Sequence, residues 1–312
     1  ETIYMLTKQP HSKLLLSHCL LACVLFFPSC GDERKDGSAS GSGKELSLKK
    51  VIVALKATDH PEKLLAQKDD LENFLSEKLK RVVEITIPTN PASVTESFRT
   101  GKIDIGYLSP TDAARNLELG TASVLLARTE NENPHYKSIW VCKKESEYSS
   151  VADLKGKPVA FASRSSEAGY LIPAWDLANR KLIGPEVALT DYFSQVLYCN
   201  GHVSAAGEVL SGEAEAAAIA DYALQGGTEA LSEGQQTQLK IFQEQGPVAT
   251  GVLCVRSSLS STDRKLLEEA FLSMNADNPE LCNRAFRGKL EVVDEHEHLK
   301  ITLEAIAVQK SL

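Results

Sequence analysis

The chain has 312 residues, of which 43% are hydrophobic and 24% are charged. This composition is typical of soluble globular proteins, and the length is sufficient for two domains. The formal net charge is −8 and no cluster of basic residues stands out, which argues against nucleic acid or an anionic membrane surface as a binding partner.

The first thirty residues have the pattern of an export signal. Two lysines precede an apolar run over residues 14–27, which is shorter than the roughly 20 residues that a membrane-spanning helix needs. The run ends in the sequence FPSC, which resembles a bacterial lipobox. We therefore predict a lipoprotein signal peptide over residues 1–30, with lipidation of Cys30. The alternative is an ordinary secretory signal with a chance cysteine. Residues 31–47, rich in glycine, serine and charge, would form a flexible tether at the periplasmic face of a bacterial membrane.

The rest of the chain alternates between apolar runs and segments with helical periodicity. We expect strands at Val51–Ala57, Val82–Pro88, Ile103–Leu108, Ser123–Ala127, Ser138–Lys143, Pro158–Ala162, Val196–Cys199, Ala216–Ala220 and Gly251–Arg256. We expect helices at Pro61–Lys80, Pro110–Leu119, Gly169–Lys181, Ser204–Leu210, Thr262–Met274 and Glu280–Arg287. This alternation predicts an α/β protein with mostly parallel sheets.

Two polar stretches mark where the chain would pass between lobes. They are Lys143–Lys157 and Gln243–Gly251, and each adjoins an apolar strand. A middle segment that is entered and left through two adjacent strands predicts two lobes joined by a two-strand hinge. Lobe 1 would comprise residues 48–142 plus 252–312, and lobe 2 would comprise residues 143–251.

The cysteines and histidines outside the signal give no metal motif. Four cysteines remain, with a spacing that matches no zinc site: Cys142, Cys199, Cys254 and Cys282. We expect buried free thiols; if any pair forms a disulfide, it would be Cys142–Cys254, because the two hinge strands would be neighbours. His296 and His298 stand two residues apart and would lie on different faces of a helix, which favours a solvated charged surface over a metal site.

Two stretches predict exposed helix N-termini. In GKIDIGYLSPTDAARNLELG, Ser109 stands at the N-cap and Pro110 at the first helical position, with Tyr107 and Thr111 as nearby hydrogen-bonding groups. In SRSSEAGYL, residues 163–171, serines again follow an apolar strand and precede a helix. Either stretch alone could be a structural cap. If both face one interlobe cleft, they would form a site for a small tetrahedral oxyanion.

Five stretches together carry a family resemblance. They are GKIDIGYLSPTDA, ARTENENPHYKSIWVCKKES, VADLKGKPVAFASRSSEAGYLIP, NGHVSAAGEVLSGEAEAAAIADYAL and GPVATGVLCVR. In this order they resemble the periplasmic phosphate/phosphite/phosphonate-binding proteins of ABC importers, over residues 48 to about 290. The resemblance implies a two-lobe type II periplasmic-binding fold and a monomeric, lipid-anchored substrate-binding protein without a cofactor. It also implies a small anionic or zwitterionic ligand and, as partners, a membrane permease and its ATPase.

The resemblance also implies the ligand-binding residues. The family's anion loop usually reads Ser-Thr-Ser-Gly, and its glycine aligns with Gly169, so that Ser166 keeps a hydroxyl while Glu167 and Ala168 replace the other two. The remaining candidates are Ser165, which could substitute for a lost hydroxyl, and Thr58, Asp59, Tyr107, Ser109, Thr111, His202, Asp221 and Tyr222.

Glu167 is unexpected in a site for an anion, and three explanations are open. Its carboxylate could point away from the ligand, in the first turn of its own helix. It could face the cleft, if the ligand brings a proton or a cationic group, as an aminoalkylphosphonate does; Asp221 and Asp59 could serve the same group. The site could also have changed to another small metabolite.

Two other function classes stay open. A receptor on the same fold could sense a ligand and pass its state to a signalling partner, without transport. An enzyme could use Ser166 as nucleophile and His202 as base. No Walker loop, zinc motif or hydrolase elbow is present in the sequence, so we predict a binding protein, not an enzyme.

Overall fold

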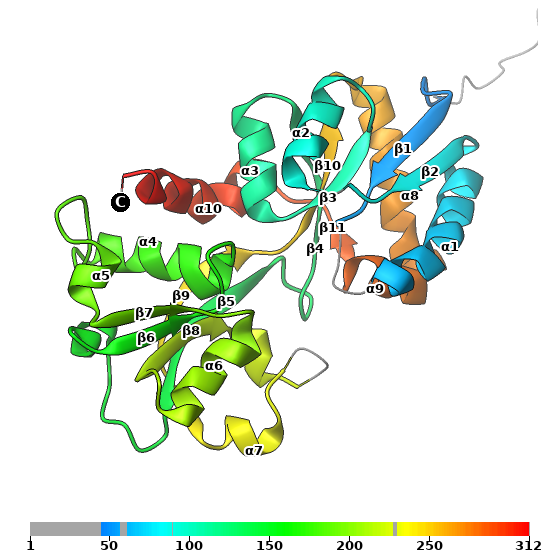
Figure 1. Ribbon diagram of the computed structural model, residues 1–312. Coiled ribbons are helices and arrows are strands. Elements are labelled where there is room, and N and C mark those ends of the chain that lie inside the picture. The colour runs from blue at the N-terminus through cyan, green and yellow to red at the C-terminus, as the bar shows by residue number, and fades with distance from the viewer. Residues whose placement is uncertain (1–44, 57–60, 89, 227–229, 312) are drawn as a thin grey trace, which may run out of the picture. The chain divides into compact units, whose positions relative to one another are not determined.

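The computed structural model describes residues 45–56, 61–88, 90–226 and 230–311, which belong to one compact unit of the chain. They form two β-sheets that each carry helices on both faces (Figure 1). The predicted signal peptide, Cys30 and most of the tether lie outside the described residues. None of the described helices is both long and apolar enough to cross a bilayer.

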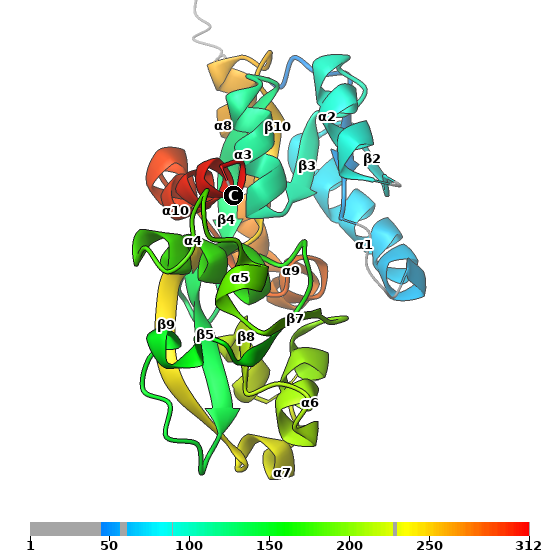
Figure 2. The ribbon, with the colours of Figure 1, turned by 60° about the vertical axis from the view of Figure 1, so that its left-hand side comes forward.

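The first sheet combines the N-terminal part of the chain with a later return segment. Its strands, in spatial order, are β11 (Leu290–Glu291), β4 (Ala122–Arg128), β10 (Val252–Arg256), β3 (Ile105–Leu108), β1 (Lys50–Ala54) and β2 (Val82–Thr86). One face is covered by α1 (Pro61–Leu79), α8 (Ser261–Asp277) and α9 (Pro279–Phe286). The other face is covered by α2 (Pro91–Arg99), α3 (Pro110–Glu118) and α10 (Glu295–Gln309). Figure 1 shows the two groups of helices on opposite sides of this sheet, and Figure 2 shows the same elements from a second direction.

The second sheet is formed by the middle of the chain. Its strands, in spatial order, are β7 (Gln195–Tyr198), β6 (Pro158–Phe161), β8 (Ala216–Ala220), β5 (His135–Lys143) and β9 (Leu239–Ala249). On one face lie α4 (Ile172–Asn179) and α5 (Leu189–Tyr192), and on the other lies α6 (His202–Ser211), with α7 (Glu233–Gln236) leading into β9. Short helical turns are η1 (Val151–Leu154), η2 (Glu167–Leu171) and η3 (Asp221–Leu224). Every residue of β8 is buried, as expected for a central strand that is covered on both faces.

The predicted α/β class with two lobes is confirmed, but the sheets are mixed. Parallel pairs join β1 to β2 and β3, and β6 to β7 and β8. The strands that lead into and out of the crossings, β5, β9 and β10, pair antiparallel with their neighbours. The prediction of mostly parallel sheets is therefore wrong for these strands. Helices α2 and α10 and strand β9 were also not predicted.

The first boundary between the lobes lies earlier in the chain than predicted, because β5 belongs to the second sheet. Strand β5 pairs with β8 and β9 in the second sheet, whereas the sequence analysis placed residues 135–142 in lobe 1. The chain leaves the first sheet after Arg128 and returns to it at Val252. From here on, lobe 1 denotes residues 45–128 and 252–311, and lobe 2 denotes residues 135–249.

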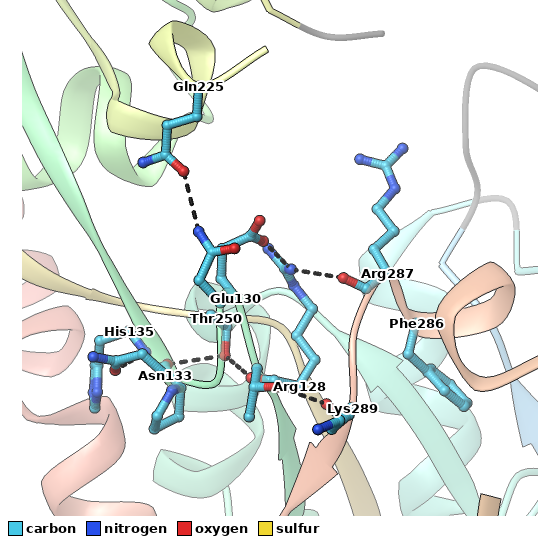
Figure 3. A network of polar contacts seen from close by, with 12 residues as sticks. Arg128, Glu130, Asn133, His135, Gln225, Thr250, Phe286, Arg287 and Lys289 are labelled. Carbon is cyan, nitrogen blue, oxygen red and sulfur yellow. Dashed lines mark hydrogen bonds and ion pairs between the residues drawn. The ribbon is translucent and has the colours of Figure 1, made fainter. Parts of the chain in front are cut away.

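The two crossings between the lobes are bonded to each other, as Figure 3 shows. The Thr250 hydroxyl donates to the backbone oxygens of Arg128 (2.6 Å) and Pro134 (2.9 Å). Arg128 also forms an ion pair with Glu130. The side-chain amide of Asn131 donates to Gln225 Oε1 of lobe 2 at 3.1 Å. Residues 129–134 and 250–251 therefore form one bonded strip, in which a change at one crossing affects the other.

Cys142 and Cys254 do not form the disulfide that was considered for the two hinge strands. Cys142 lies in β5 of the second sheet and Cys254 in β10 of the first, and all four described cysteines are free. Burial raises the pKa of the Cys142 and Cys254 thiols, so both behave as neutral apolar side chains. The Cys142–Cys254 alternative is wrong because the strands that carry them belong to different sheets.

Asp104 gives lobe 1 a buried polar anchor whose loss we expect to be costly. The carboxylate is 5% exposed and accepts from the backbone N–H of Ile52 (2.9 Å) and from Arg256 Nε (2.9 Å). Asp104→Ala leaves both donors without their acceptor, so we expect a loss of about 3 kcal/mol in the free energy of unfolding, measured by urea denaturation. Asp277→Ala removes the exposed pair with Lys78 and should cost much less, because solvent screens an exposed ion pair. Equal losses would contradict this account.

Candidate functional site between the lobes

The N-terminus of α3 presents hydrogen-bond donors at the edge of lobe 1. As predicted, Ser109 is the N-cap and Pro110 the first helical residue. The Ser109 hydroxyl accepts from Asp112 N (3.2 Å) and donates to Asp112 Oδ2 (2.7 Å). Its hydrogen-bonding capacity is thus used inside the cap. Thr111, in contrast, directs its backbone N–H and its hydroxyl toward lobe 2.

The loop after β6 supplies the matching element of lobe 2. Ser166 caps the η2 turn by accepting from Gly169 N at 2.9 Å, and the loop is closed by Ala162 N, which donates to Gly169 O at 3.1 Å. Beneath it, the buried Ser138 hydroxyl donates to Ala168 O at 2.6 Å. The η2 turn runs directly into α4. The loop is therefore held from its ends and from below.

Gly169 fills a position with no room for a side chain. A Cβ atom there would lie 2.3 Å from Ala162 Cβ and 2.8 Å from Ser166 Oγ. We expect Gly169→Ala to displace the loop and to lower the free energy of unfolding by roughly 2 kcal/mol, measured by thermal or urea denaturation. Gly207→Ala, on α6, meets no atom within 4 Å and serves as the control, because it should leave stability unchanged or raise it. A Gly169→Ala variant that is as stable as the wild type would contradict the close packing of this loop.

Glu167 connects the two elements across the lobes. Its Oε1 accepts from the backbone N–H of Thr111 at 2.6 Å and also from the Thr111 hydroxyl. The residue is only 8% exposed. Burial raises the pKa of the Glu167 carboxyl to about 7, although the two Thr111 donors and Lys56 act in the opposite direction. The Glu167 carboxylate thus points at the N-terminus of α3 in lobe 1, which is the direction that the second of the three explanations requires.

Aromatic residues and one further acid surround the same region. Tyr222 lies between Tyr136 and His202, with ring centroids 5.5 Å from each. His202 Nδ1 accepts from Ala220 N at 3.2 Å, which leaves Nε2 to carry the proton of a neutral ring. Tyr136 is close enough to Glu167 and Asp221 for both acids to raise the pKa of its hydroxyl, after burial as the main cause.

Asp221 carries an unmet hydrogen-bond requirement. Its Oδ1 is buried and has no hydrogen-bond partner within the described part of the chain. Burial raises the pKa of the Asp221 carboxyl, against the effect of the backbone N–H groups of Lys137 and Tyr222. A cavity of about 320 Å³ lies beside it, lined among others by Tyr136, Lys137, Glu130 and Gln225. A donor from a ligand in this cavity would satisfy the carboxylate.

The structure thus brings together Thr111, Glu167, His202, Asp221 and Tyr222, but not every predicted residue. Tyr107 packs edge-on against Phe286 and its hydroxyl donates to Phe286 O at 3.3 Å, while burial raises its pKa to about 12. Ser165 is exposed, and its hydroxyl lies 3.2 Å from that of Ser163. Thr58 and Asp59 lie outside the described residues.

Tyr136 lies in the site but was not predicted from the sequence. It packs with Ala168, Tyr222 and Val248 in the apolar cluster beneath the loop. A signal was present, because Tyr136 stands two residues after Pro134 in one of the stretches that carry the resemblance. Its role depends on the sheet to which β5 belongs, which the sequence did not reveal.

A larger cavity, of about 640 Å³, lies against α10 and is lined among others by Trp175 and His298. It shares His135 and Pro247 with the cavity beside Asp221. The prediction of a solvated surface is wrong for His298, which is 4% exposed and packs against the His135 ring in a tilted arrangement, with ring centroids 4.8 Å apart. Its Nε2 lies 3.3 Å from Thr250 O, and burial lowers the pKa of the ring to about 4. Within the described residues, no group of three potential ligands could hold a metal ion. Elements of both lobes meet at Glu167 and Thr111, which makes this contact the centre of the candidate site.

Solved structures share this fold at low sequence identity. A Xanthomonas citri protein with bound chloride superimposes with a TM-score of 0.71 at 16% identity, covering 85% of this chain and 100% of that one. PhnD1 from Prochlorococcus marinus, in complex with methylphosphonate, gives 0.62 at 17% identity, with coverage of 85% and 99%. A binding-protein component of an ABC phosphonate transporter from Pseudomonas aeruginosa gives 0.60 at 18%, with coverage of 84% and 87%.

The family itself is shown by sequence. The model of the family described as "ABC transporter, phosphonate, periplasmic substrate-binding protein" matches residues 53–297, which include all of lobe 2, most of lobe 1, and both Thr111 and Glu167. Members of this family are substrate-binding proteins and not enzymes. In keeping with this, the Ser166 hydroxyl is used as a helix cap. The chain therefore belongs to the family of periplasmic substrate-binding proteins of phosphonate ABC transporters.

Proposed function

We propose that the protein captures a small phosphorus oxyanion between its lobes and delivers it to the permease of an ABC importer. The observation that carries the proposal is the meeting of the α3 N-terminus of lobe 1 with the residue 163–169 loop of lobe 2. The first turn of a helix offers unpaired N–H groups and a positive dipole end, which suit an anion. The Thr111 N–H and hydroxyl already hold one carboxylate oxygen there.

Among phosphorus oxyanions, the surroundings favour a phosphonate that also carries an amino group. Two acids, Glu167 and Asp221, lie close enough to Tyr136 to raise the pKa of its hydroxyl, and Asp221 and Tyr136 line the same cavity. The buried oxygen of Asp221 lacks a donor within the described residues, and an ammonium group would supply one. Phosphate, phosphite and simple alkylphosphonates lack this group, so they would leave the oxygen unsatisfied.

The proposed cellular setting follows from the sequence and the family. The family is periplasmic, and the FPSC sequence supports attachment of Cys30 to a lipid at the membrane surface. The protein would act as a monomer, with ligand binding shifting its population toward the form that the permease recognises. A sensor that signals without transport has no observation in its favour.

Isothermal titration calorimetry tests the ligand class. We expect 2-aminoethylphosphonate to bind most tightly at pH 7, methylphosphonate more weakly, and phosphate and phosphite weakest. Acetate and ethanolamine serve as controls for the anionic and cationic ends alone. Binding of ethanolamine as tight as that of 2-aminoethylphosphonate, or no heat with any phosphorus compound from folded protein, would contradict the proposal.

A further inference from the structure

The contact between Glu167 and Thr111 is an anion already bound at a helix N-terminus. The carboxylate comes from lobe 2, and the donors come from the first turn of α3, a nine-residue helix of lobe 1. The two residues are separated by 56 positions in the chain. A carboxylate with these two donors makes the contacts that an anionic ligand would make in the same place.

We propose that Glu167 is a built-in competitor of the ligand's anionic group, which occupies the α3 N-terminus and holds the lobes together while no ligand is bound. This inference rests on the proposed function in one respect, the anionic character of the ligand. The role assigned to Glu167 is to select among ligands and to set their affinity. The ligand must displace the carboxylate or neutralise it.

Two features of the site make simultaneous binding unfavourable. The Thr111 N–H points at one acceptor position, and Glu167 Oε1 occupies it at 2.6 Å. A second anion beside it would face a like charge in a setting where Glu167 is only 8% exposed and charges interact strongly. Of the charged groups near Glu167, Lys56 opposes this repulsion and Asp112 adds to it.

Competition of this kind has a measurable consequence. If most molecules hold Glu167 on α3, only the remaining fraction is ready to bind an anion, and the apparent affinity is lowered by that fraction. Removing the charge or the acceptor of Glu167 should therefore tighten anion binding. If Glu167 were an ordinary ligand-binding residue, the same change would weaken anion binding.

Three variants separate the charge from the contact. Glu167→Gln keeps the shape and an acceptor but removes the charge. Glu167→Ala removes the acceptor, and Thr111→Val weakens the same contact from lobe 1 without touching Glu167. Glu213→Gln is the matched control, because Glu213 is an exposed acid of lobe 2.

Two measurements are made on each protein. In calorimetry with methylphosphonate, Glu167→Gln and Glu167→Ala are expected to bind about tenfold more tightly than the wild type. In small-angle X-ray scattering without ligand, Glu167→Ala and Thr111→Val are expected to show a larger radius of gyration than the wild type. The Glu213→Gln control should match the wild type in both measurements.

The outcomes distinguish this inference from the proposed function. Weaker binding of methylphosphonate by both Glu167 variants, or scattering by Glu167→Ala and Thr111→Val that is identical to that of the wild type, would overturn the competitor role. If no protein binds methylphosphonate, the proposed ligand class fails for this compound, while the scattering comparison still decides whether Glu167 holds the lobes. If Glu167→Ala does not fold, Thr111→Val and Glu167→Gln still decide the question.

Discussion

Asp221→Asn is expected to lower the affinity for 2-aminoethylphosphonate about a hundredfold, because it removes the charge from a buried, hydrogen-bonded ion pair with the ligand. The reason lies in Asp221 Oδ1, which is buried without a partner in the described part of the chain. Burial raises the pKa of the Asp221 carboxyl, and an ammonium group that donates to this oxygen would lower it again. Competition calorimetry with the wild type and the variant measures the loss.

Methylphosphonate provides the internal control for this prediction. It lacks the amino group and has no ammonium donor for Asp221 Oδ1, so its affinity should change by less than about threefold in Asp221→Asn. Equal losses for the two ligands would mean that Asp221 acts through the shape of the site. An unchanged affinity for 2-aminoethylphosphonate would place the ammonium group elsewhere.

The second large effect concerns the pH dependence of stability. Burial raises the pKa of Glu167 from 4.5 to about 7 in the folded protein, so the folded state binds this proton more tightly than the unfolded state. The stabilisation by the proton is complete below about pH 4.5 and is lost as the pH rises to about 7. Over this window we expect the wild type to lose about 3 kcal/mol relative to Glu167→Gln, which has no proton to lose.

Urea denaturation of the two proteins at half-unit steps between pH 4 and 8 measures this difference. Other titrating groups cancel in it, including His298, whose lowered pKa has the opposite effect: stability falls as the pH drops from about 6.5 to about 4. Lys56 and Asp112 act on Glu167 itself and are present in both proteins. A difference that stays constant across the range would show that the carboxyl titrates normally.

The local features of the site could be predicted from the sequence because their causes are local. Ser109 and Pro110 occupy the positions in α3 that their side chains favour. The serine-rich loop leads from a buried strand into a helix, as its pattern indicates. The α/β class follows from alternating strands and helices, and the two lobes follow from the polar stretches at Lys143–Lys157 and Gln243–Gly251. These features depend on the order of neighbouring residues and need no knowledge of distant contacts.

The global features could not be predicted, because they depend on contacts that the sequence pattern does not encode. An apolar run such as SIWVCK shows that a strand is buried, but not which sheet it joins; β5 was therefore assigned to the wrong lobe. Strand β9 has eleven residues, but several of its positions are polar and partly exposed. Its sequence therefore lacks the apolar pattern by which a buried strand is recognised. The direction of the Glu167 side chain is set by Thr111, 56 residues away.

A crystal structure of the protein with 2-aminoethylphosphonate tests the central claim most directly, because it locates both ends of the ligand. We predict the phosphonate group at the N-terminus of α3, on the Thr111 donors, with Glu167 displaced from them, and the ammonium group against Asp221. A ligand bound elsewhere, or a phosphonate group that leaves the contact between Glu167 and Thr111 intact, would contradict the account.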